Sequence, residues 1–237
     1  MTDILTIKNL SYKRNLTNIL NQLNCSLPTG SIVGLLGENG AGKTTLMRLI
    51  SGAANHYRGE IKVSSETSPS DRKQLVSFSH QVDDVNRSDR LEKIAHFYEA
   101  VYPDFSTNKF QRLSEFLNLD LSRHLNDLSK GNQMKFIIAI TLSRQVKLYL
   151  LDEPFDGIDS MSRKKIIASI LQWKPEDATI LISDHHVDDI ANILDGILIV
   201  KDKRIIVSKN ADKIREDYGQ SIEDFFESFY KGEDQND

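Results

Sequence analysis

A glycine-rich segment near the start of the chain has the residue types of a phosphate-binding loop. It fits the pattern GxxxxGK[ST] over the residues Gly37-Glu38-Asn39-Gly40-Ala41-Gly42-Lys43-Thr44-Thr45. The glycines allow backbone angles and close approaches that a Cβ atom would forbid, so successive N–H groups can converge on phosphate oxygens. Lys43 would then meet the β- and γ-phosphates, and the Thr44 hydroxyl would coordinate Mg²⁺. An ordinary glycine-rich turn is disfavoured because the complete pattern is present.

Two adjacent carboxylates follow an apolar run in the second half of the chain. The segment Lys147-Leu148-Tyr149-Leu150-Leu151-Asp152-Glu153-Pro154 is typical of a buried strand that ends in acidic residues. Asp152 is suited to hold Mg²⁺, directly or through water. Glu153 is suited to polarise a water that attacks the γ-phosphate. The plainer alternative is an acidic pair on a surface turn.

The elements around these residues predict an α/β fold with a mixed, largely parallel sheet. An apolar run at 31–36 and an amphipathic run at 44–50 supply the strand, loop and helix context that the glycine-rich pattern requires. Alternation favours antiparallel strands at the N-terminal edge. The expected strands are 4–7, 19–27, 59–63, 75–79, 147–151, 179–183 and 197–200, and the expected helices outside the insert are 44–50, 162–173 and 187–194, with a loop at 64–70.

A helical insert is expected between the early and late strands. From about 87 to 143 the pattern is helical, with segments at 91–102, 107–119 and 131–143 and with Thr107 as N-cap of the second. Near the C-terminus, aromatic residues predict one amphipathic helix before an acidic end, through Phe225, Phe226, Phe229 and Tyr230.

Composition narrows the class of protein. The chain has 237 residues, 39% of them hydrophobic, and a formal net charge of −4, so we expect an ordinary globular core and no nucleic-acid partner. The single cysteine, Cys25, permits no disulfide within the chain and is assigned no chemistry. The N-terminus does not have the pattern of a secretion signal, and the apolar runs are shorter than the ~20 residues of a membrane span. If the protein serves a membrane, a partner spans it.

The segment Leu128-Ser129-Lys130-Gly131-Asn132 resembles the LSGGQ signature of ABC-type ATPases. Lys130 replaces one glycine and Asn132 replaces the glutamine. The segment lies at the start of the helical run before Asp152, where that family places its signature. Taken alone, this pentapeptide would be interpreted as a helix-capping turn.

Other residues fall in the order that the family has. Tyr12 is similar in position to the adenine-stacking aromatic residue, Gln81 to the Q-loop glutamine, Asp159 of Gly157-Ile158-Asp159 to the D-loop aspartate, and His185 to the switch histidine. Each has a plainer interpretation: a packing aromatic, a strand-end polar residue, a helix cap and a surface histidine. His80 and His186 are interpreted as having no role, although His185 and His186 remain interchangeable.

The resemblance implies an ABC-type P-loop NTPase and a set of roles for its residues. Glu153, His185 and Gln81 are the expected catalytic residues, and Thr44, Gln81 and Asp152 the expected Mg²⁺ ligands. ATP would be held by a larger group: Tyr12, Gly37, Glu38, Asn39, Gly40, Ala41, Gly42, Lys43, Thr44, Thr45, Ser129, Gly131, Asn132 and Asp159.

The resemblance also implies partners and a division of the chain. Two such subunits, as a homodimer or a heterodimer, would face each other head to tail, so that the signature segment of one acts on ATP held by the other. The expected parts are a RecA-like lobe (1–84 and 145–220), a helical subdomain (85–144) and an acidic C-terminal helix and tail (221–237). An integral membrane permease subunit would hold the pair at the cytoplasmic face of the membrane and would dock near 81–85. The aromatic stretch 96–105 would either line that groove or pack in the core.

Three points stay open at this stage. The stretch 96–105, the short helical insert and the signature together resemble those of bacterial exporter ATPases for drugs, antimicrobial peptides or amphipathic toxins, so the leading hypothesis is the ATP-hydrolysing subunit of such an exporter. The alternatives are a soluble ABC-type ATPase that acts on targets outside the membrane, a GTPase or kinase that shares only the glycine-rich loop, and a degenerate regulatory partner. The side chain of Lys130 would place its cation near the γ-phosphate or in solvent.

Overall fold

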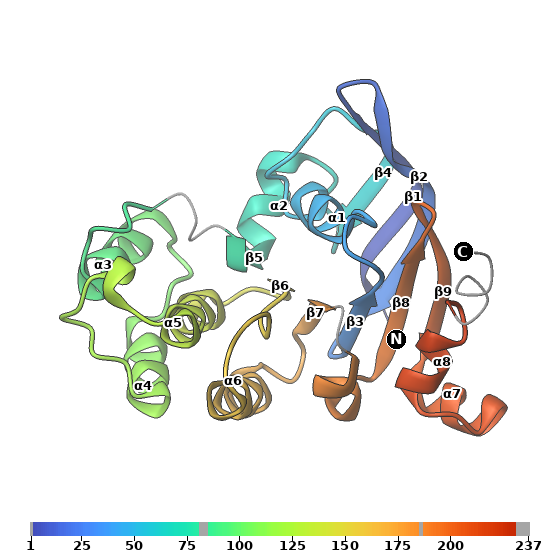
Figure 1. The fold of residues 1–237 in the computed structure, drawn as a ribbon. Helices are drawn as coiled ribbons and strands as arrows, with labels where there is room; N and C mark the ends of the chain where they lie inside the picture. The colour runs from blue at the N-terminus through green and yellow to red at the C-terminus, as the bar shows by residue number, and fades with distance from the viewer. Residues whose placement is uncertain (1, 81–84, 185–186, 231–237) are drawn as a thin grey trace.

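The computed structural model describes residues 2–80, 85–184 and 187–230 and contains two sheets (Figure 1). The smaller sheet is antiparallel and has the order β2-β1-β4, formed by β1 (Asp3–Arg14), β2 (Thr17–Pro28) and β4 (Arg58–Val63). The larger sheet has the order β5-β6-β7-β3-β8-β9, formed by β3 (Ile32–Leu36), β5 (Val76–Phe78), β6 (Leu148–Asp152), β7 (Thr179–Asp184), β8 (Gly196–Lys201) and β9 (Arg204–Asn210). Its strands are parallel apart from the β8–β9 hairpin.

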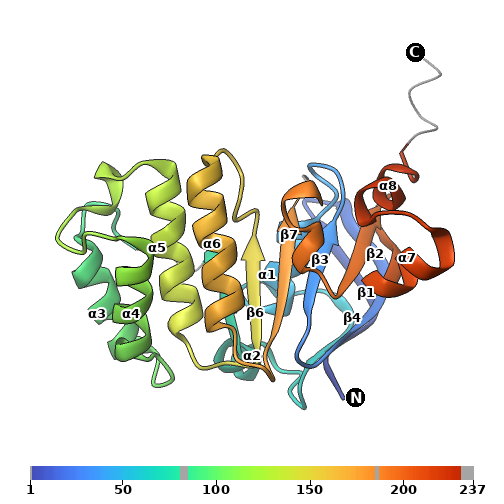
Figure 2. The same ribbon diagram turned by 90° about the horizontal axis from the view of Figure 1, so that it is seen from below.

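Helices cover the sheets and form one end of the molecule. They are α1 (Lys43–Ile50), α2 (Pro69–Leu75), α3 (Leu91–Val101), α4 (Thr107–Leu117), α5 (Lys130–Ser143), α6 (Ser160–Trp173), α7 (Ala211–Tyr218) and α8 (Ile222–Glu227), with short 3₁₀ helices η2 (Leu125–Asp127), η3 (Val187–Asp189) and η4 (Ala191–Ile193). Figure 2 shows α3 and α4 at the far end from the small sheet, with α5 and α6 side by side between them and β6. In the described ranges, every helix falls short of the length and apolar character that crossing a bilayer demands.

The central strands are apolar on both faces because both faces are covered. On β6, Leu148 and Leu150 belong to the core between the two sheets, which also contains α1. Tyr149 and Leu151 point the other way, into the core shared with α5 and α6. Successive side chains of a strand alternate between faces, so a continuous apolar run is what a strand buried on both sides needs. The carboxyl end of β6 and the starts of α5 and α6 lie at the same edge of the molecule (Figure 2).

The predicted fold class is confirmed: the chain is α/β, with a largely parallel sheet, antiparallel N-terminal strands and a helical segment between the strands. The N-terminal strands form a sheet of their own with β4 rather than extending the larger one. Helix α1 and the helices α3, α4, α5 and α6 lie close to the expected ranges.

Several local predictions are wrong. The segment 187–194 is not one helix but the two 3₁₀ turns η3 and η4. Strand β9 and helix α7 were not expected, and α2 occupies part of the segment predicted as loop. The N-cap of α4 is Ser106, whose Oγ accepts a hydrogen bond from the backbone N–H of Lys109 at 3.2 Å, and Thr107 is the first helical residue.

The aromatic stretch 96–105 is mostly a packing element. Tyr98 and Phe105 are 3% and 9% exposed and belong to the main core. Their rings lie 6.3 Å apart, and Tyr98 also stacks on Tyr102 at 5.5 Å. Phe97 is 55% exposed, and its ring meets that of Tyr98 edge-on at 6.0 Å. The core-packing alternative for Tyr98 and Phe105 is therefore the correct one.

Candidate functional site

The phosphate loop joins β3 to α1 and is shaped by two glycines. A Cβ atom on Gly37 would lie 2.5 Å from the carbonyl oxygen of Val200, and one on Gly42 would lie 2.8 Å from Leu20 Cδ2. Gly42 has φ +103 and is the N-cap of α1, so no side chain caps the helix. The first N–H groups of a helix have no partner within it and carry partial positive charge. The start of α1 can therefore receive an anion such as phosphate.

Lys43 is the first residue of α1 and is almost fully buried, with 4% of its side chain exposed. Its Nζ donates hydrogen bonds to the carbonyl oxygens of Gly37 at 2.7 Å and Glu38 at 3.1 Å. The carboxylate Oε1 of Glu153 lies 3.7 Å from the same Nζ. The cation is thus folded back over the loop, at the place where terminal phosphate oxygens would replace the two carbonyls.

The charges around Lys43 are unbalanced. Burial lowers the pKa of Lys43, and the nearby carboxylates of Glu153, Asp152 and Asp184 partly offset that effect. One cation therefore faces three acidic groups. An additional cation at this edge would balance the negative charge of these carboxylates. A bound triphosphate would add further negative charge and so increase the need for such a cation.

Asp152 ends β6 and is held by side chains from three other elements. Its backbone N–H donates to Ser79 Oγ at 3.0 Å, its Oδ1 accepts from the Ser183 hydroxyl, and His80 Nε2 lies 3.0 Å from its Oδ2. Burial raises the pKa of Asp152, but hydrogen bonds from His80, Ser183 and Thr44 outweigh burial and keep that pKa below its usual value. Asp152 is therefore ionised at neutral pH.

The oxygen atoms at this position fit Mg²⁺. The Thr44 hydroxyl lies close enough to the Asp152 carboxylate to lower its pKa, so a hydroxyl and a carboxylate oxygen lie together beside the phosphate loop. Mg²⁺ prefers oxygen ligands and is usually held by one or two protein groups, the rest being substrate phosphates and water. Among the residues that the structure describes, no three His, Cys, Asp or Glu side chains are placed so that they could hold a metal ion by themselves.

Glu153 follows Asp152 in a backbone conformation that few side chains adopt, with φ 47. Its N–H donates to both the carbonyl oxygen and the Oγ of Ser183, at 3.1 and 3.0 Å. Its own carbonyl oxygen accepts from the N–H of Asp156 at 3.2 Å, which closes a turn. A left-handed residue that is not glycine persists only where its surroundings enforce it, and Ser183 of β7 supplies that constraint. The result is that the Glu153 carboxylate faces Lys43.

The signature segment (128–132) does not join this group of charges. Ser129 is the N-cap of α5, and its Oγ accepts from the N–H of Asn132 at 3.3 Å. A Cβ atom on Gly131 would lie 2.7 Å from Ser162 Oγ at the start of α6. Lys130 Nζ lies 2.8 Å from Asp156 Oδ2, so its cation points neither to the phosphate loop nor freely into solvent.

The other expected nucleotide residues are spread around the loop. Tyr12 is half-buried on β1 opposite Leu20, the residue that packs against Gly42. Asp159 is the N-cap of α6, since its Oδ1 accepts from Ser162 N–H at 2.9 Å. The rest of the loop is exposed or half-buried, namely Glu38, Asn39, Gly40, Ala41, Thr44 and Thr45. Gln81 and His185, with its alternative His186, lie outside the described residues, so their roles stay predictions.

Four polar residues of the site were missed from the sequence. Ser79 and His80 follow β5, and Ser183 and Asp184 end β7. In parallel sheets the carboxyl ends of neighbouring strands meet at one edge, where ligands bind. The polar residues that end the apolar runs at 75–79 and 179–183 were the signal. His80 in particular had been given no role, whereas it contacts Asp152.

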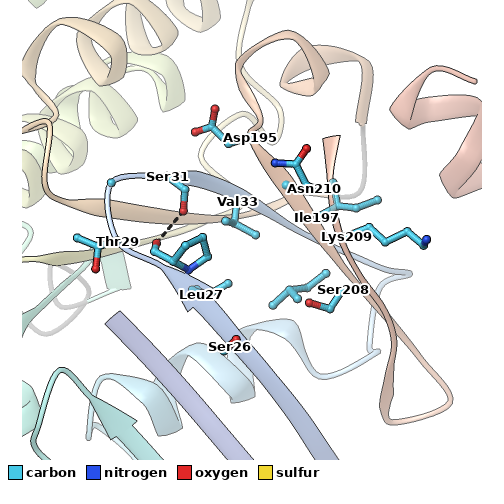
Figure 3. A pocket seen from close by; sticks show the side chains of 14 residues that line it. Ser26, Leu27, Thr29, Ser31, Val33, Asp195, Ile197, Ser208, Lys209 and Asn210 are labelled. Atoms are coloured by element: carbon cyan, nitrogen blue, oxygen red, sulfur yellow. Dashed lines mark hydrogen bonds between the residues drawn. The ribbon is translucent and has the colours of Figure 1, made fainter. Parts of the chain in front are cut away.

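A cavity of about 400 Å³ lies elsewhere, where β2 ends and β3 and β8 begin (Figure 3). Ser31 Oγ donates to the carbonyl oxygen of Pro28 at 2.9 Å, and Asp195 Oδ2 accepts from the N–H of Ile32 at 2.8 Å. The cavity adjoins the amino ends of β3 and β8, whereas the phosphate loop follows the carboxyl end of β3. It is therefore separate from the phosphate loop.

Solved structures have the same fold. The structure of an ATP-binding subunit of an ABC transporter superposes with a TM-score of 0.84 and 24% identity, covering 96% of this chain and 99% of that one.

Curated proteins are similar over most of their length. The lantibiotic transport ATP-binding protein SrtF of Streptococcus pyogenes is 28% identical over 213 residues, which cover 88% of this chain and 92% of that protein. The manganese transport system ATP-binding protein MntB of Halalkalibacterium halodurans is 28% identical over 222 residues, covering 90% and 88%.

The sequence profile of the ABC transporter family matches residues 20–156, which is more than half of the chain. The match contains the phosphate loop, the signature segment and both carboxylates at the end of β6. This chain therefore belongs to the ABC transporter family, as an ATP-binding subunit that hydrolyses ATP.

Proposed function

We propose that this chain is the ATP-hydrolysing subunit of a bacterial exporter whose cargo is an amphipathic molecule such as an antimicrobial peptide. Its similarity to a lantibiotic transport protein supports this choice of cargo, and the similarity to a manganese transport protein is the reason the direction needs a test of its own. The observation that carries the enzymatic part is the convergence of Lys43, Asp152 and Glu153 at one edge of the sheet.

The phosphate loop would bind the triphosphate before any chemistry takes place. Backbone N–H groups at the start of α1 donate to phosphate oxygens, and Lys43 Nζ leaves the carbonyls of Gly37 and Glu38 for the β- and γ-phosphates. Mg²⁺ held by Asp152 and Thr44 would neutralise charge that develops on the phosphate oxygens. Tyr12 would stack on the adenine.

Glu153 would act as the general base in hydrolysis. Its carboxylate accepts a proton from water as the water oxygen bonds to the γ-phosphorus, while the bond from that phosphorus to the bridging oxygen of ADP breaks. Ser183 holds the Glu153 backbone so that the carboxylate stays beside Lys43. Gln81 would orient the water and the metal, and His185 would contact the γ-phosphate.

The second half of each ATP site would come from a second subunit. Ser129, Gly131 and Asn132 lie at the exposed start of α5, where the Ser129 hydroxyl and the backbone N–H groups of the first turn would meet a phosphate from another chain. ATP bound between two subunits favours the closed dimer through its higher affinity for that state, and hydrolysis removes the preference. In a homodimer or a heterodimer alike, Asp159 would lie next to the contact between the signature turn of one subunit and the ATP held by the other.

The subunit works with a membrane permease. As an ATP-binding subunit of its family the chain lies at the cytoplasmic face of the membrane. We propose that residues 85–144 form the helical subdomain that meets the permease near 81–85, and that 1–84 with 145–220 form the lobe that holds the nucleotide.

The enzymatic part is tested with Glu153→Gln, which keeps the shape of the side chain and removes its basicity. Turnover should fall by about 10²–10⁴-fold, that is by about 3–5 kcal/mol in the barrier, while ATP affinity changes little. The matched control is Glu60→Gln, on the exposed surface of β4. Equal turnover in wild type and Glu153→Gln, measured with and without the permease, would remove Glu153 from the mechanism.

The direction of transport needs a sided assay. The complete transporter is placed in proteoliposomes, and ATP is added outside, where it reaches only subunits that face outward. An exporter then accumulates an added amphipathic peptide in the lumen. Loss of preloaded peptide from the lumen on the same ATP addition would identify an importer and overturn the proposal.

A further inference from the structure

Lys130 is the position at which the signature segment departs most from the family pattern, and the structure gives its side chain a definite partner. Nζ lies 2.8 Å from Asp156 Oδ2, with 57% and 47% of the two side chains exposed. The partner belongs to the loop that follows Glu153, far from α5 in sequence. The lysine therefore joins the start of α5 to the loop after β6, both of which lie at the same edge of the fold (Figure 2).

The aliphatic stem of Lys130 also contacts this loop, at Gly157. Gly157 has φ +61, and a Cβ atom there would lie 2.5 Å from Lys130 Nζ and 3.3 Å from Cδ and Cε. On the neighbouring residue, a Cβ on Gly131 would meet Ser162 Oγ at 2.7 Å and Asp159 Oδ2 at 3.2 Å. Two adjacent residues of the signature turn thus rest directly on the segment 156–162. An ion pair formed by chance on the surface would not bring this second layer of contacts.

The loop that forms the ion pair with Lys130 is hydrogen-bonded to Glu153. The backbone N–H of Asp156 donates to the carbonyl oxygen of Glu153 at 3.2 Å, and the Glu153 carboxylate lies 3.7 Å from Lys43 Nζ. A continuous set of contacts therefore runs from the signature turn to the phosphate loop inside one subunit. It consists of one ion pair, one backbone hydrogen bond and one charge contact.

We infer that Lys130 is a positioning residue whose ion pair with Asp156 links the two ATP sites of the dimer. The inference rests on the proposed function, in which the signature turn acts on ATP held by the second subunit while Glu153 acts on ATP held by its own. A displacement of the signature turn on closure is then transmitted through Asp156 to the turn that aims Glu153. In this chain the lysine takes part in transmission rather than in contact with phosphate.

The size of the effect follows from the exposure of the pair. An exposed ion pair contributes up to about 1 kcal/mol, and 1.4 kcal/mol corresponds to a factor of ten, so the coupling should amount to about fivefold at most. It should also weaken at high ionic strength, because salt screens exposed charges. Both features separate this role from that of a phosphate ligand, whose removal would weaken ATP binding itself.

The experiment is a double-mutant cycle on the complete transporter with its permease. Lys130→Met keeps the stem and removes the charge, Asp156→Asn keeps the shape and removes the charge, and the double variant completes the cycle. Turnover at saturating ATP, the Hill coefficient for ATP and the ATP dissociation constant of the isolated subunit are measured at low and high salt. The control cycle is Arg215→Met with Asp212→Asn, an exposed ion pair with a 2.9 Å separation on α7.

The expected result is a two- to fivefold loss of turnover and a lower Hill coefficient in each single variant, no further loss in the double variant, and an unchanged ATP dissociation constant. High salt should lower the turnover of wild type toward that of the variants. In the control cycle, turnover should be the same in all four proteins.

Two outcomes would overturn the inference. If wild type turns over and the two single variants match it, or if their losses simply multiply in the double variant, Lys130 does not act through Asp156, although the proposed function stands. If wild type shows no turnover even with its permease, the proposed function fails and the inference fails with it.

Discussion

The phosphate-loop side and the signature side of this molecule are built in opposite ways. Lys43 and Asp152 are 4% and 7% exposed, Lys43 donates hydrogen bonds to carbonyls of the phosphate loop, and Asp152 accepts one from Ser183 of β7, so that half of the site is assembled within the chain. Ser129 and Lys130 are exposed, and their polar contacts hold the turn itself and the adjoining loop. Burial fixes the first group without a ligand, whereas the second is an exposed helix start whose Asn132 N–H is capped by Ser129 Oγ.

Because of this difference, some substitutions should affect a single subunit, whereas others should have an effect only in a pair of subunits. Changes on the buried side should alter nucleotide binding or turnover however the subunit is assembled. Changes on the exposed side should leave binding by the isolated subunit intact and appear only when two subunits close on ATP. The predictions below separate the two sides, beginning with the largest effect.

Lys43→Ala should have the largest effect. It removes the lysine cation that faces Glu153, Asp152 and Asp184, so both its attraction for the triphosphate and its stabilisation of the developing charge are lost. Turnover should fall by at least about 10²-fold, the loss typical of one preorganised electrostatic group, and ATP affinity by about tenfold or more. Titration calorimetry of the isolated subunit and a phosphate-release assay measure the two. Unchanged ATP affinity of the isolated subunit would contradict the assignment of the buried side.

Ser183→Ala should have an intermediate effect on the same side. The hydroxyl donates to Asp152 and also accepts from the N–H of Glu153, so its loss leaves a buried carboxylate with one donor fewer and loosens the turn that aims Glu153. A hydrogen bond to a charged group is worth about 1.5–3 kcal/mol, so turnover should drop about 10- to 100-fold. Single-turnover hydrolysis kinetics give the number.

The control for that change is Ser169→Ala. Ser169 is equally buried, on α6, and its hydroxyl donates to the carbonyl oxygen of Ile166 at 2.7 Å, away from the site. It should cost stability without a comparable loss of turnover. If both serine variants lose turnover in proportion to their stability, Ser183 is only a packing residue.

The sequence predicted the contiguous parts of the site and missed the parts that depend on strand pairing. Lys43 and the glycines lie in one segment, and Asp152 with Glu153 in another, so short patterns were sufficient to find them. Ser183 becomes relevant only because β7 pairs with β6 in the register that places Ser183 opposite Asp152. Pairing between segments about 30 residues apart is set by the packing of the whole sheet, and no local pattern encodes it.

The same limit explains the errors in the fold. The predicted loop at 64–70 overlaps only the first two residues of α2, and no helix is predicted there, yet Arg72 in α2 is fully buried and donates to the carbonyl oxygens of Leu49 at 3.0 Å and Ile50 at 3.2 Å. Its start had a local signal, since Ser68 caps the helix and Pro69 is its first residue. The burial of Arg72 had no local signal, because most of its partners lie in other elements, among them the carbonyl groups at the end of α1 and that of Ile61 in β4.

Ser129→Ala should act mainly on the pair of subunits. The N-cap of α5 is lost, which costs about 1 kcal/mol of stability, and the hydroxyl available to a second subunit's ATP is lost with it. ATP affinity of the isolated subunit should stay within about twofold of wild type, a change below about 0.5 kcal/mol. ATP-driven dimerisation, followed by sedimentation velocity in a Glu153→Gln background, should weaken by more than the stability change explains. Weaker ATP binding by the monomer would place Ser129 on the buried side after all.

Asp159→Asn should have the smallest effect, and it is visible only in acid. Hydrogen bonds from the hydroxyl and N–H of Ser162 lower the pKa of Asp159 in the folded state. A lowered carboxyl pKa contributes stability above the unfolded value and loses it as the pH falls through the folded one, so the contribution disappears below about pH 4. Asparagine caps a helix as well as aspartate does, so stability at pH 7 should change little. The thermal unfolding temperature should therefore fall less steeply between about pH 5 and pH 2 in Asp159→Asn than in wild type. Asp202→Asn, in the exposed β8–β9 turn, serves as the control and should follow wild type. If the unfolding temperature of Asp159→Asn falls with pH as steeply as that of Asp202→Asn, the charge of the α6 cap does not stabilise the segment that adjoins the signature turn.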